Sequence, residues 1–342
     1  MRRRILGGTG ISVSDHALGA MMFGGLSDTD DDEAVRIIHR AMDAGINFID
    51  TADVYSTGGS ERVVGKALKG GRRDEVVLAT KGHLPMGPDA NQGGNSRRWL
   101  TRALEDSLRR LGTDHVDLYQ VHRPDPDTDI DETLSALSDF VRSGKARAVG
   151  TSTFPAEQLV EAQWASERRG HVRLRTEQPH YSLLARGVER AVLPTAQKYG
   201  LGVLTWGPLS AGWLSGRIRS AADIDLGQGR GSVERHKFDP ALPGNARKLE
   251  AVGLLAKLAE EAGLPLPHLA TAFVRAHPAI TSVILGPRTM DHLDSLLTGA
   301  EVTLSADVLD RIDEIVPPGT DLNADDFYFT PPPLTDASLR RR

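Results

Sequence analysis

The chain has 342 residues, a formal net charge of -5, 39% hydrophobic residues and 25% charged residues. No apolar run approaches the roughly 18 residues of a membrane span, so we expect a soluble protein with no membrane partner. Basic and acidic residues are interspersed, which argues against a nucleic-acid partner, and the absence of cysteine excludes disulfides, thiol catalysis and thiolate metal sites.

The amino terminus has the basic start of a signal peptide but lacks the apolar stretch that would follow it, so we expect a cytoplasmic protein. Short segments at 3–5 and 11–13 flank the run Gly7-Gly8-Thr9-Gly10. No helix follows this glycine-rich run, so a hairpin turn is a better interpretation than a phosphate loop.

Short apolar runs then alternate with longer amphipathic segments, as in repeated strand and helix units. The predicted strands end near Ala20, Asp50, Lys81, His122, Thr151, Gln178, Trp206 and Gly286. The predicted helices cover 30–44, 59–69, 96–111 with Ser96 as its N-cap, 130–143, 155–168, 187–199, 246–277 and 289–297. Eight such units fit an α/β fold of the (β/α)8 TIM-barrel type better than a doubly wound sheet.

Three additions decorate the predicted barrel. The first is the hairpin at its amino-terminal end, and the second is the segment 208–244, which is rich in Gly, Pro and charge and follows the seventh strand. The third is an extra helix from Ser305 to Val316, followed by a tail that we expect to be extended at Pro331 to Pro333. No linker divides the chain, so we expect one domain over 1–342, with the barrel at about 15–300, the extra helix at about 304–316 and the tail at 317–342.

Polar side chains end three successive predicted strands. Asp50, Lys81 and His122 terminate the second, third and fourth strands, and Tyr55 lies five residues beyond Asp50. Because the carboxyl ends of barrel strands share one mouth, these side chains should converge. Taken alone, Asp50 could cap a turn, Lys81 could be an exposed cation and His122 could be a structural histidine at the end of the barrel. Their joint placement favours a catalytic group.

This group suits proton donation to a carbonyl oxygen. Tyr55 would donate the proton, and the ammonium of Lys81 would stabilise the phenolate that remains. A buried lysine needs a counter-ion, and Asp50 is the natural one. His122 would orient the substrate oxygen. Side chains cannot deliver hydride, so a nicotinamide cofactor would have to supply it.

Three segments resemble the aldo-keto reductase family: 45–55 (GINFIDTADVY), 107–119 (SLRRLGTDHVDLY) and 149–152 (VGTS). The resemblance covers about residues 1 to 316 and suggests a bacterial, actinomycete-like member. It implies a catalytic tetrad of Asp50, Tyr55, Lys81 and His122, and NADP(H) extended across the barrel mouth. It implies cofactor contacts from Ala20, Met21, Asp50, Ser152, Thr153, Gln178, Trp206, Pro208, Leu209, Ser210, Gly216, Gly286, Arg288 and His292.

Within that set, Ser152, Thr153 and Gln178 would hold the nicotinamide carboxamide, and Trp206 would either stack on the ring or simply fill the barrel top. Gly286 and Arg288 precede a predicted helix, where free backbone N–H groups favour phosphate. The charge of Arg288 favours NADP over NAD. His292 would contact the phosphate or lie on the helix surface.

The sequence also departs from the family pattern. Thr153 stands where the family usually has Asn, and Ser295 and Leu296 stand where many members carry Glu and Asn. The histidines show no metal-binding spacing, so we expect no metal site.

Two alternative functions remain open at this stage. One is a Schiff-base aldolase with Lys81 as nucleophile, and the other is a binding module that retains the cofactor for regulation. For a reductase, the substrate would be a small aldehyde, a ketone or a keto-sugar. The sequence predicts no oligomeric state, because a closed barrel has no free sheet edge to pair.

Overall fold

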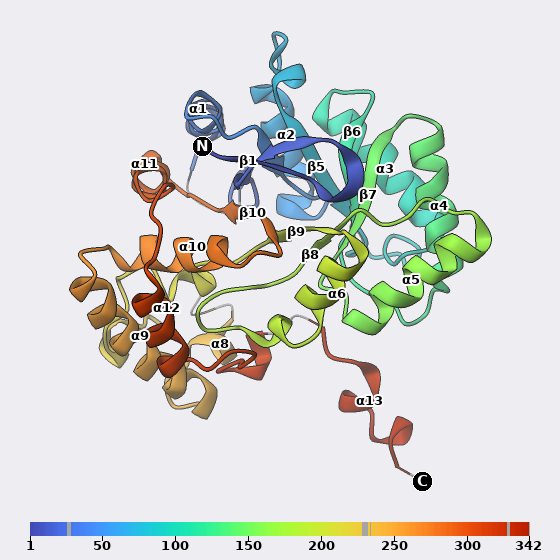
Figure 1. Cartoon of the computed structure of the whole chain (residues 1–342). Helices are drawn as coiled ribbons and strands as arrows, with labels where there is room; N and C mark the ends of the chain where they lie inside the picture. The colour runs from blue at the N-terminus through green and yellow to red at the C-terminus, as the bar shows by residue number, and fades with distance from the viewer. Residues whose placement is uncertain (26–28, 228–231, 233, 327–328, 342) are drawn as a thin grey trace.

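The computed structural model describes residues 1–25, 29–227, 232, 234–326 and 329–341. In this part of the chain, eight parallel strands close into a barrel in the order β10-β3-β4-β5-β6-β7-β8-β9. Helices surround the barrel on its outer face (Figure 1). This is the (β/α)8 architecture that the repeating strand and helix pattern predicted.

Every barrel strand ends within one residue of the position expected from the sequence. The strands are β3 His16–Gly19, β4 Phe48–Asp50, β5 Val77–Gly82, β6 Val116–Val121, β7 Ala146–Ser152, β8 Thr176–Gln178, β9 Gly202–Thr205 and β10 Ile280–Leu285. The strand ends were predictable because a buried apolar run must stop where the chain turns toward solvent.

The helices follow the predicted order. They are α1 Asp31–Asp43, α2 Gly59–Ala67, α3 Arg97–Leu111, α4 Ile130–Arg142, α5 Ala156–Arg169, α6 Val192–Tyr199, α9 Pro243–Glu261, α10 Leu266–Ala276, α11 Met290–Thr298 and α12 Ala306–Ile315. Ser96 and Ser305 cap α3 and α12 by accepting a backbone N–H from the first turn, as expected. None of the described helices is long and apolar enough to cross a membrane.

Two predicted helices were wrong in extent. The single helix expected over 246–277 is two helices, because Gly263 adopts a left-handed φ of 67° and Pro265 follows it. The helix expected over 187–199 begins only at Val192. The preceding segment, η4 Gly187–Glu189, is a separate 3-10 turn tied by an ion pair between Arg186 and Glu189 at 2.8 Å.

The long segment after β9 and the tail contain short helical turns. The segment 208–244 holds η5 Ser210–Gly212, η6 Ala221–Asp223 and α8 Arg235–Phe238. The tail holds η7 Ala324–Asp326, α13 Pro332–Thr335 and η8 Ala337–Leu339. The expectation of an extended chain at Pro331 to Pro333 was wrong, because proline is tolerated in the first turn of a helix, where its missing N–H has no partner to lose.

Alternate residues of the strands face opposite sides of the sheet and form separate apolar clusters. The cluster inside the barrel contains Ala17, Phe48, Val77, Ala79, Leu118, Ala148, Leu204 and Ile284, together with Leu6 and Val13 from the hairpin. The predicted hairpin is confirmed as β1 Arg3–Ile5 paired with β2 Ser12–Ser14. A Cβ on Gly7 would lie 2.3 Å from the carbonyl oxygen of Arg175, so the turn packs directly against the barrel floor.

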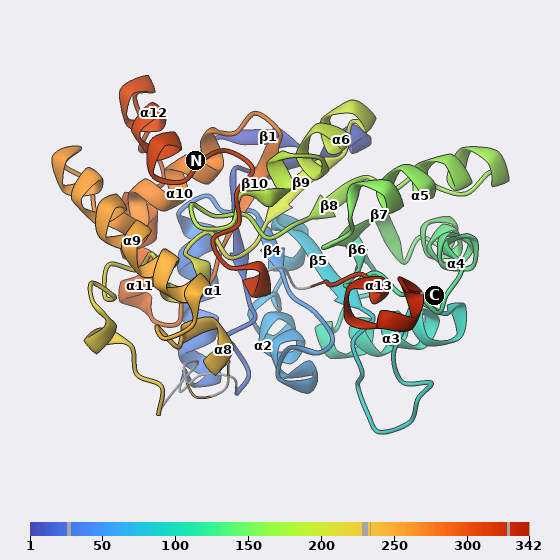
Figure 2. The same ribbon diagram turned by 90° about the horizontal axis from the view of Figure 1, so that it is seen from below.

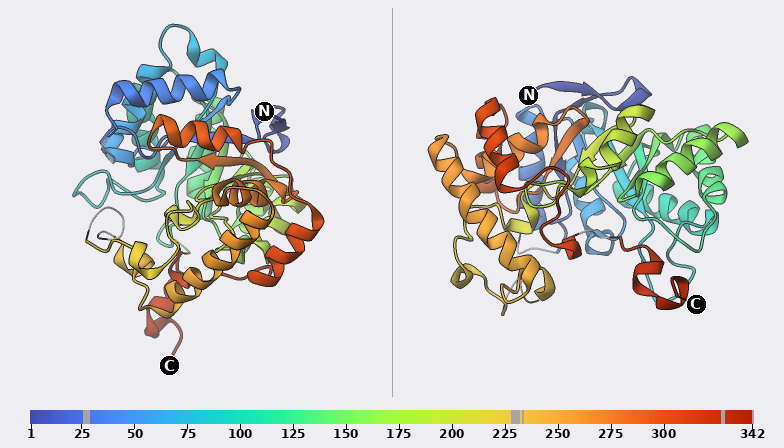
Figure 3. Two further views of the ribbon diagram at one scale, coloured as in Figure 1. Left: turned by 90° about the vertical axis from the view of Figure 1, so that its left-hand side faces the viewer. Right: turned by 60° about the horizontal axis from the view of Figure 1, so that its bottom comes forward.

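The hairpin and the tail lie at opposite ends of the barrel. Figure 2 shows β1 at one end and α8, α13 and the carboxyl terminus at the other, where the barrel strands end. Figure 3 shows α9 and α12 side by side on one flank, from which the tail leads to η7. The polar strand ends therefore open toward the long loop and the tail, while the apolar layer and the hairpin close the floor.

Candidate active site

The four residues expected to form a catalytic group lie together at the open end of the barrel. Asp50 ends β4, Lys81 lies near the end of β5, His122 directly follows β6, and Tyr55 begins η2 Tyr55–Gly58. Lys81 Nζ donates to Asp50 Oδ1 at 2.5 Å, to the carbonyl of Thr51 at 2.9 Å and to Tyr55 Oη at 3.2 Å. The Tyr55 and His122 rings meet edge to face with centroids 5.7 Å apart.

Lys81 remains a cation in this environment. Its side chain is fully buried, and burial by itself lowers the pKa of an ammonium. The Asp50 carboxylate and the Tyr55 oxygen outweigh burial, so the pKa of Lys81 lies above its usual value of 10.5. The site therefore holds a fixed positive charge beside the Tyr55 hydroxyl.

His122 is a neutral imidazole. Burial, followed by the charges of Lys81, Arg123 and His83, holds the pKa of His122 well below its usual value of 6.5. Its Nδ1 atom is buried and has no hydrogen-bond partner among the residues that the structure describes. A neutral ring carries one N–H and one acceptor nitrogen, so it can donate to a substrate oxygen without bringing a second charge.

Two glutamines hold the second oxygen of Asp50. Gln178 Nε2 donates to Asp50 Oδ2 at 2.9 Å, and Gln120 Nε2 approaches the same oxygen at 3.3 Å. The sequence interpretation placed Gln178 on the cofactor and missed Gln120. Strand alternation would have found Gln120, because it lies two residues before His122 on β6 and so faces the same side of the sheet.

The backbone after Tyr55 is strained. Ser56, Thr57 and Gly58 all adopt left-handed conformations, with φ of 50°, 50° and 84°. Such conformations are costly for side chains other than glycine and persist where the surroundings impose them. Ser56 Oγ donates to the carbonyl of Phe23 at 3.1 Å, and Gly58 leaves room for the side chain of Arg110. Packing thus fixes the turn that presents Tyr55.

The residues expected at the nicotinamide lie on the next strands. Ser152 Oγ donates to the carbonyl of Gln178 at 2.9 Å, and Thr153 adopts a left-handed φ of 62°. Trp206 is half-buried and stacks on His180, with ring centroids 4.4 Å apart and planes 20° apart. The sequence interpretation missed His180, which gives Trp206 a flat support.

Two other predicted contacts, Ala20 and Met21, directly follow β3, which pairs with β4. The backbone N–H of Ala20 donates to the carbonyl of Asp50 at 2.8 Å, and Met21 is 39% exposed at the mouth. The loop after β9 carries Pro208, Leu209, Ser210 and Gly216. Ser210 and Ala211 are consecutive left-handed residues, with φ of 47° and 58°. This loop is held in an unusual conformation beside Trp206.

Basic side chains gather at the start of α11. Arg288 is exposed, and Thr289 caps the helix by accepting the backbone N–H of His292. Partial burial, then the charges of Arg288 and Arg217, lower the pKa of His292 below 6.5. The sequence interpretation missed Arg217, although it directly follows Gly216, which was expected to contact the cofactor.

These features fit a nicotinamide dinucleotide. The stacked rings of Trp206 and His180 suit a flat ring, and a helix start with nearby arginines suits phosphate. The predicted cofactor residues follow the carboxyl ends of neighbouring strands, from Ser152 on β7 and Gln178 on β8, past Trp206 after β9 and Gly286 after β10, to Met21 after β3.

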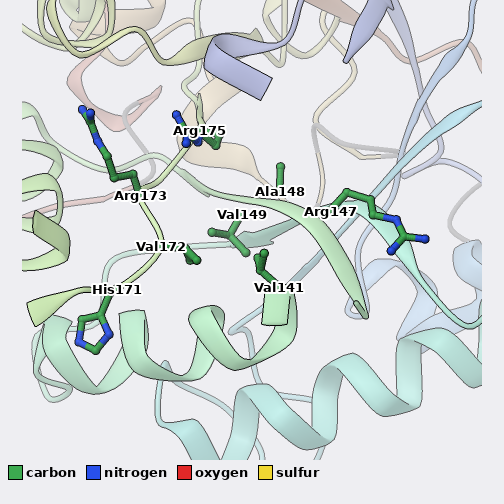
Figure 4. Close-up of a pocket in the computed structure, with 8 residues that line it drawn as sticks. All are labelled: Val141, Arg147, Ala148, Val149, His171, Val172, Arg173 and Arg175. Carbon is green, nitrogen blue, oxygen red and sulfur yellow. The ribbon is translucent and has the colours of Figure 1, made fainter. Parts of the chain in front are cut away.

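A separate hollow of about 320 Å³ lies at the other end of the barrel. It is lined by Val141, Val149 and Val172 with arginines around them, and the guanidinium groups of Arg147 and Arg173 extend away from each other (Figure 4). Its residues begin β7 and precede β8, on the side of the hairpin. The arginines do not converge on a common point, so the tetrad remains the candidate site.

Comparison with known proteins identifies the family of this chain. The sequence model of the Aldo/keto reductase family matches residues 17–317. The uncharacterized oxidoreductase YrpG of Bacillus subtilis (strain 168) is 40% identical, over 93% of this chain and 96% of its own. The chain belongs to the aldo/keto reductase family. The resemblance inferred from the sequence motifs is thereby confirmed.

Other similar proteins differ in their described roles. The aldo-keto reductase YhdN of Bacillus subtilis (strain 168) is 35% identical over 84% of this chain and 85% of its own. A probable voltage-gated potassium channel subunit beta of Arabidopsis thaliana is 34% identical over 92% of this chain and 97% of its own. Aldo/keto reductases generally use a nicotinamide cofactor and act on small carbonyl compounds, which supports a carbonyl oxidoreductase function for this chain.

Proposed function

We propose that this aldo/keto reductase reduces an aldehyde or ketone to the alcohol with NADPH, reversibly, and that Tyr55 is the general acid. The observation that carries the proposal is the position of Lys81 Nζ, which bonds to both Asp50 Oδ1 and Tyr55 Oη. A cation held by a buried carboxylate and aimed at a phenol has a direct use in proton transfer.

In the proton step, Tyr55 Oη gives its proton to the carbonyl oxygen of the substrate. The Lys81 ammonium, 3.2 Å away, stabilises the phenolate that remains. Asp50 keeps Lys81 charged without itself reaching the substrate. In the oxidation direction, the phenolate accepts the proton of the alcohol.

His122 orients the carbonyl. Its neutral ring lies edge to face with Tyr55, so one N–H donates to the same substrate oxygen that Tyr55 protonates. Two donors directed at one oxygen would fix its position relative to the nicotinamide.

The cofactor, when bound, supplies the hydride. Ser152, Thr153 and Gln178 would hold the carboxamide, and Trp206 would stack on the nicotinamide. The other predicted cofactor residues would hold the phosphates and the adenosine, namely Ala20, Met21, Pro208, Leu209, Ser210, Gly216, Gly286, Arg288 and His292. Arg217 joins Arg288 and His292 as a candidate for the 2′-phosphate, which supports NADPH over NADH.

The experiment is NADPH consumption with a panel of aldehydes, ketones and keto-sugar nucleotides. Tyr55→Phe should lower kcat about a thousandfold while NADPH still binds. An unchanged kcat in Tyr55→Phe, or no turnover with any carbonyl in the wild-type protein, would overturn the proposal.

A Schiff-base reaction at Lys81 is opposed by the site. An amine nucleophile must lose its proton, and the raised pKa of Lys81 works against that. Borohydride treatment with a carbonyl compound should therefore leave no adduct on Lys81, which mass spectrometry of the digested protein would check.

A binding role without turnover is the second candidate, because one similar protein is named as a potassium channel subunit. Steady NADPH consumption over many turnovers would exclude a purely binding role. A single domain over 1–342 and a cytoplasmic location complete the proposal.

A further inference from the structure

Glu177 is a carboxylate buried directly behind the proposed carboxamide site. It precedes Gln178 on β8, so its side chain points to the outer face of the sheet while Gln178 points inward. Glu177 has no exposed surface. Its Oε2 accepts the hydroxyl of Thr151 at 2.6 Å, and its Oε1 accepts the backbone N–H of Phe154 at 3.1 Å.

These contacts hold the turn that follows β7. Thr153 is β-branched and left-handed, with φ of 62°, which is a rare and unfavourable state for such a residue. The backbone N–H groups of Phe154 and Thr153 both stabilise the charge on Glu177. Thr153 N also donates to the carbonyl of Gln178 at 3.2 Å. The turn is therefore held to β8 by a buried anion and a main-chain hydrogen bond.

We propose that Glu177 is a positioning residue for the cofactor: it holds the turn at Thr153 and Phe154 so that Ser152 and Thr153 face the carboxamide. Glu177 does not itself touch the cofactor or the substrate. This inference rests on the proposed function, because Ser152 and Thr153 are carboxamide ligands only in that proposal.

The charge of Glu177 matters to this role. Burial raises the pKa of Glu177 to about 7. The hydrogen bonds from Thr151 and from the backbone of the turn, and the positive charge of Arg123, act in the opposite direction and lower this pKa. An ionised carboxylate accepts N–H groups more strongly than a neutral carboxyl does. The hydrogen bonds that Glu177 accepts from the turn should therefore weaken as the pH falls below neutrality and the carboxylate is protonated.

The main experiment compares wild type, Glu177→Gln and a control, Glu189→Gln. Glutamine has the shape of the protonated carboxyl. Glu189 is a partly buried acceptor, and its partners are Tyr181, Arg186 and Gly319 instead of the turn after β7. The readout is the Kd for NADPH, measured by quenching of tryptophan fluorescence from about pH 6 to about pH 8.5.

In wild type and in Glu189→Gln, we expect the Kd to rise about fivefold as the pH falls through 7. In Glu177→Gln, we expect the Kd at about pH 8.5 to be as high as the wild-type Kd at about pH 6. The roughly fivefold change of the Kd between these pH values should be lost. Equal Kd values and equal pH profiles in Glu177→Gln and Glu189→Gln would overturn the inference. Failure of the wild-type protein to bind NADPH would instead overturn the proposed function.

Two further variants test the mechanism. Glycine adopts a left-handed conformation without strain, so in a Thr153→Gly background the effect of Glu177→Gln on the Kd should shrink below about twofold. An undiminished effect would contradict the role of Glu177 in holding Thr153. If Glu177→Gln does not fold, Thr151→Val removes one donor to Glu177, and the pH midpoint of NADPH affinity should move upward; an unmoved midpoint would overturn the inference.

Discussion

Gln178 Nε2 donates a hydrogen bond to Oδ2 of Asp50 at 2.9 Å, although the two residues are 128 positions apart. The other oxygen of Asp50 holds Lys81 at 2.5 Å. One carboxylate thus connects the proton-donating side of the site with a residue proposed to bind the cofactor. A change at Gln178 should therefore affect both binding and chemistry.

Gln178→Ala removes a donor to Asp50 and a proposed carboxamide contact together. We expect the NADPH Kd to rise about tenfold and kcat to fall about tenfold. Gln120→Ala is the matched control, because Gln120 approaches the same oxygen at 3.3 Å but is not among the cofactor residues. It should lower kcat and leave the Kd unchanged. Identical effects of the two variants on the Kd would contradict the prediction.

Lys81→Met should destabilise the fold, because it leaves the Asp50 carboxylate buried without its counter-ion. Removing one partner of a buried pair costs about 3 to 5 kcal/mol of the free energy of unfolding. Adding Asp50→Asn should recover part of this loss. Urea unfolding measures both changes. Lys66→Met is the control, since Lys66 Nζ and Asp32 Oδ1 are 2.6 Å apart but both side chains are exposed, and it should have no measurable effect.

Asp53→Asn should stabilise the protein in a pH-dependent way. Burial, and then the charge of Glu61, raise the pKa of Asp53 from 3.8 to about 8, and no side chain among the described residues donates a hydrogen bond to either carboxylate oxygen. The unfolded chain releases this proton at lower pH than the folded protein does, so the free energy of unfolding falls as the pH rises from about 4 to about 8.

The asparagine variant removes this charge. At pH 8 it should therefore raise the free energy of unfolding by at least about 3 kcal/mol, and at pH 4 it should change little. Urea unfolding at the two pH values tests this expectation. Asp310→Asn, on the exposed side of α12, should show no such difference. A variant that is no more stable than wild type at pH 8 would count against it.

Arg288→Ala and Arg217→Ala should weaken the binding of NADPH more than the binding of NADH, because only NADPH carries the 2′-phosphate. We expect kcat/KM with NADPH to fall about tenfold or more, and kcat/KM with NADH to change little. Arg219→Ala is a suitable control, since Arg219 lies on the same loop but faces Glu260 at 3.9 Å. Equal losses with the two cofactors would contradict the assignment.

Much of the fold and of the tetrad could be predicted because both depend on local patterns. Each barrel strand is a short and largely buried run, and the carboxyl ends of parallel strands meet at one mouth. Gln120 was equally predictable from the alternation on β6. The division between α9 and α10 could have been read from Gly263 and Pro265, which end a helix for steric reasons.

Other residues could not be predicted from local patterns. Glu177, Arg217 and His180 matter because of the side chains they meet, which come from other strands and loops. Their contacts depend on tertiary packing, which the pattern of neighbouring residues along the chain does not show. The short helix at Pro332 likewise carried no periodic signal, because its 4 residues span barely one turn.

The apolar layer between the hairpin and the tetrad also determines how protons reach Tyr55. Phe48, Ala79 and Leu118 lie inside the barrel below Asp50 and Lys81 and provide no group that can carry a proton. In the proposed mechanism, a proton lost from Tyr55 would therefore return from the mouth, on the side proposed for the substrate. A ligand bound in the mouth would then delay both the exchange of substrate and the reprotonation of Tyr55.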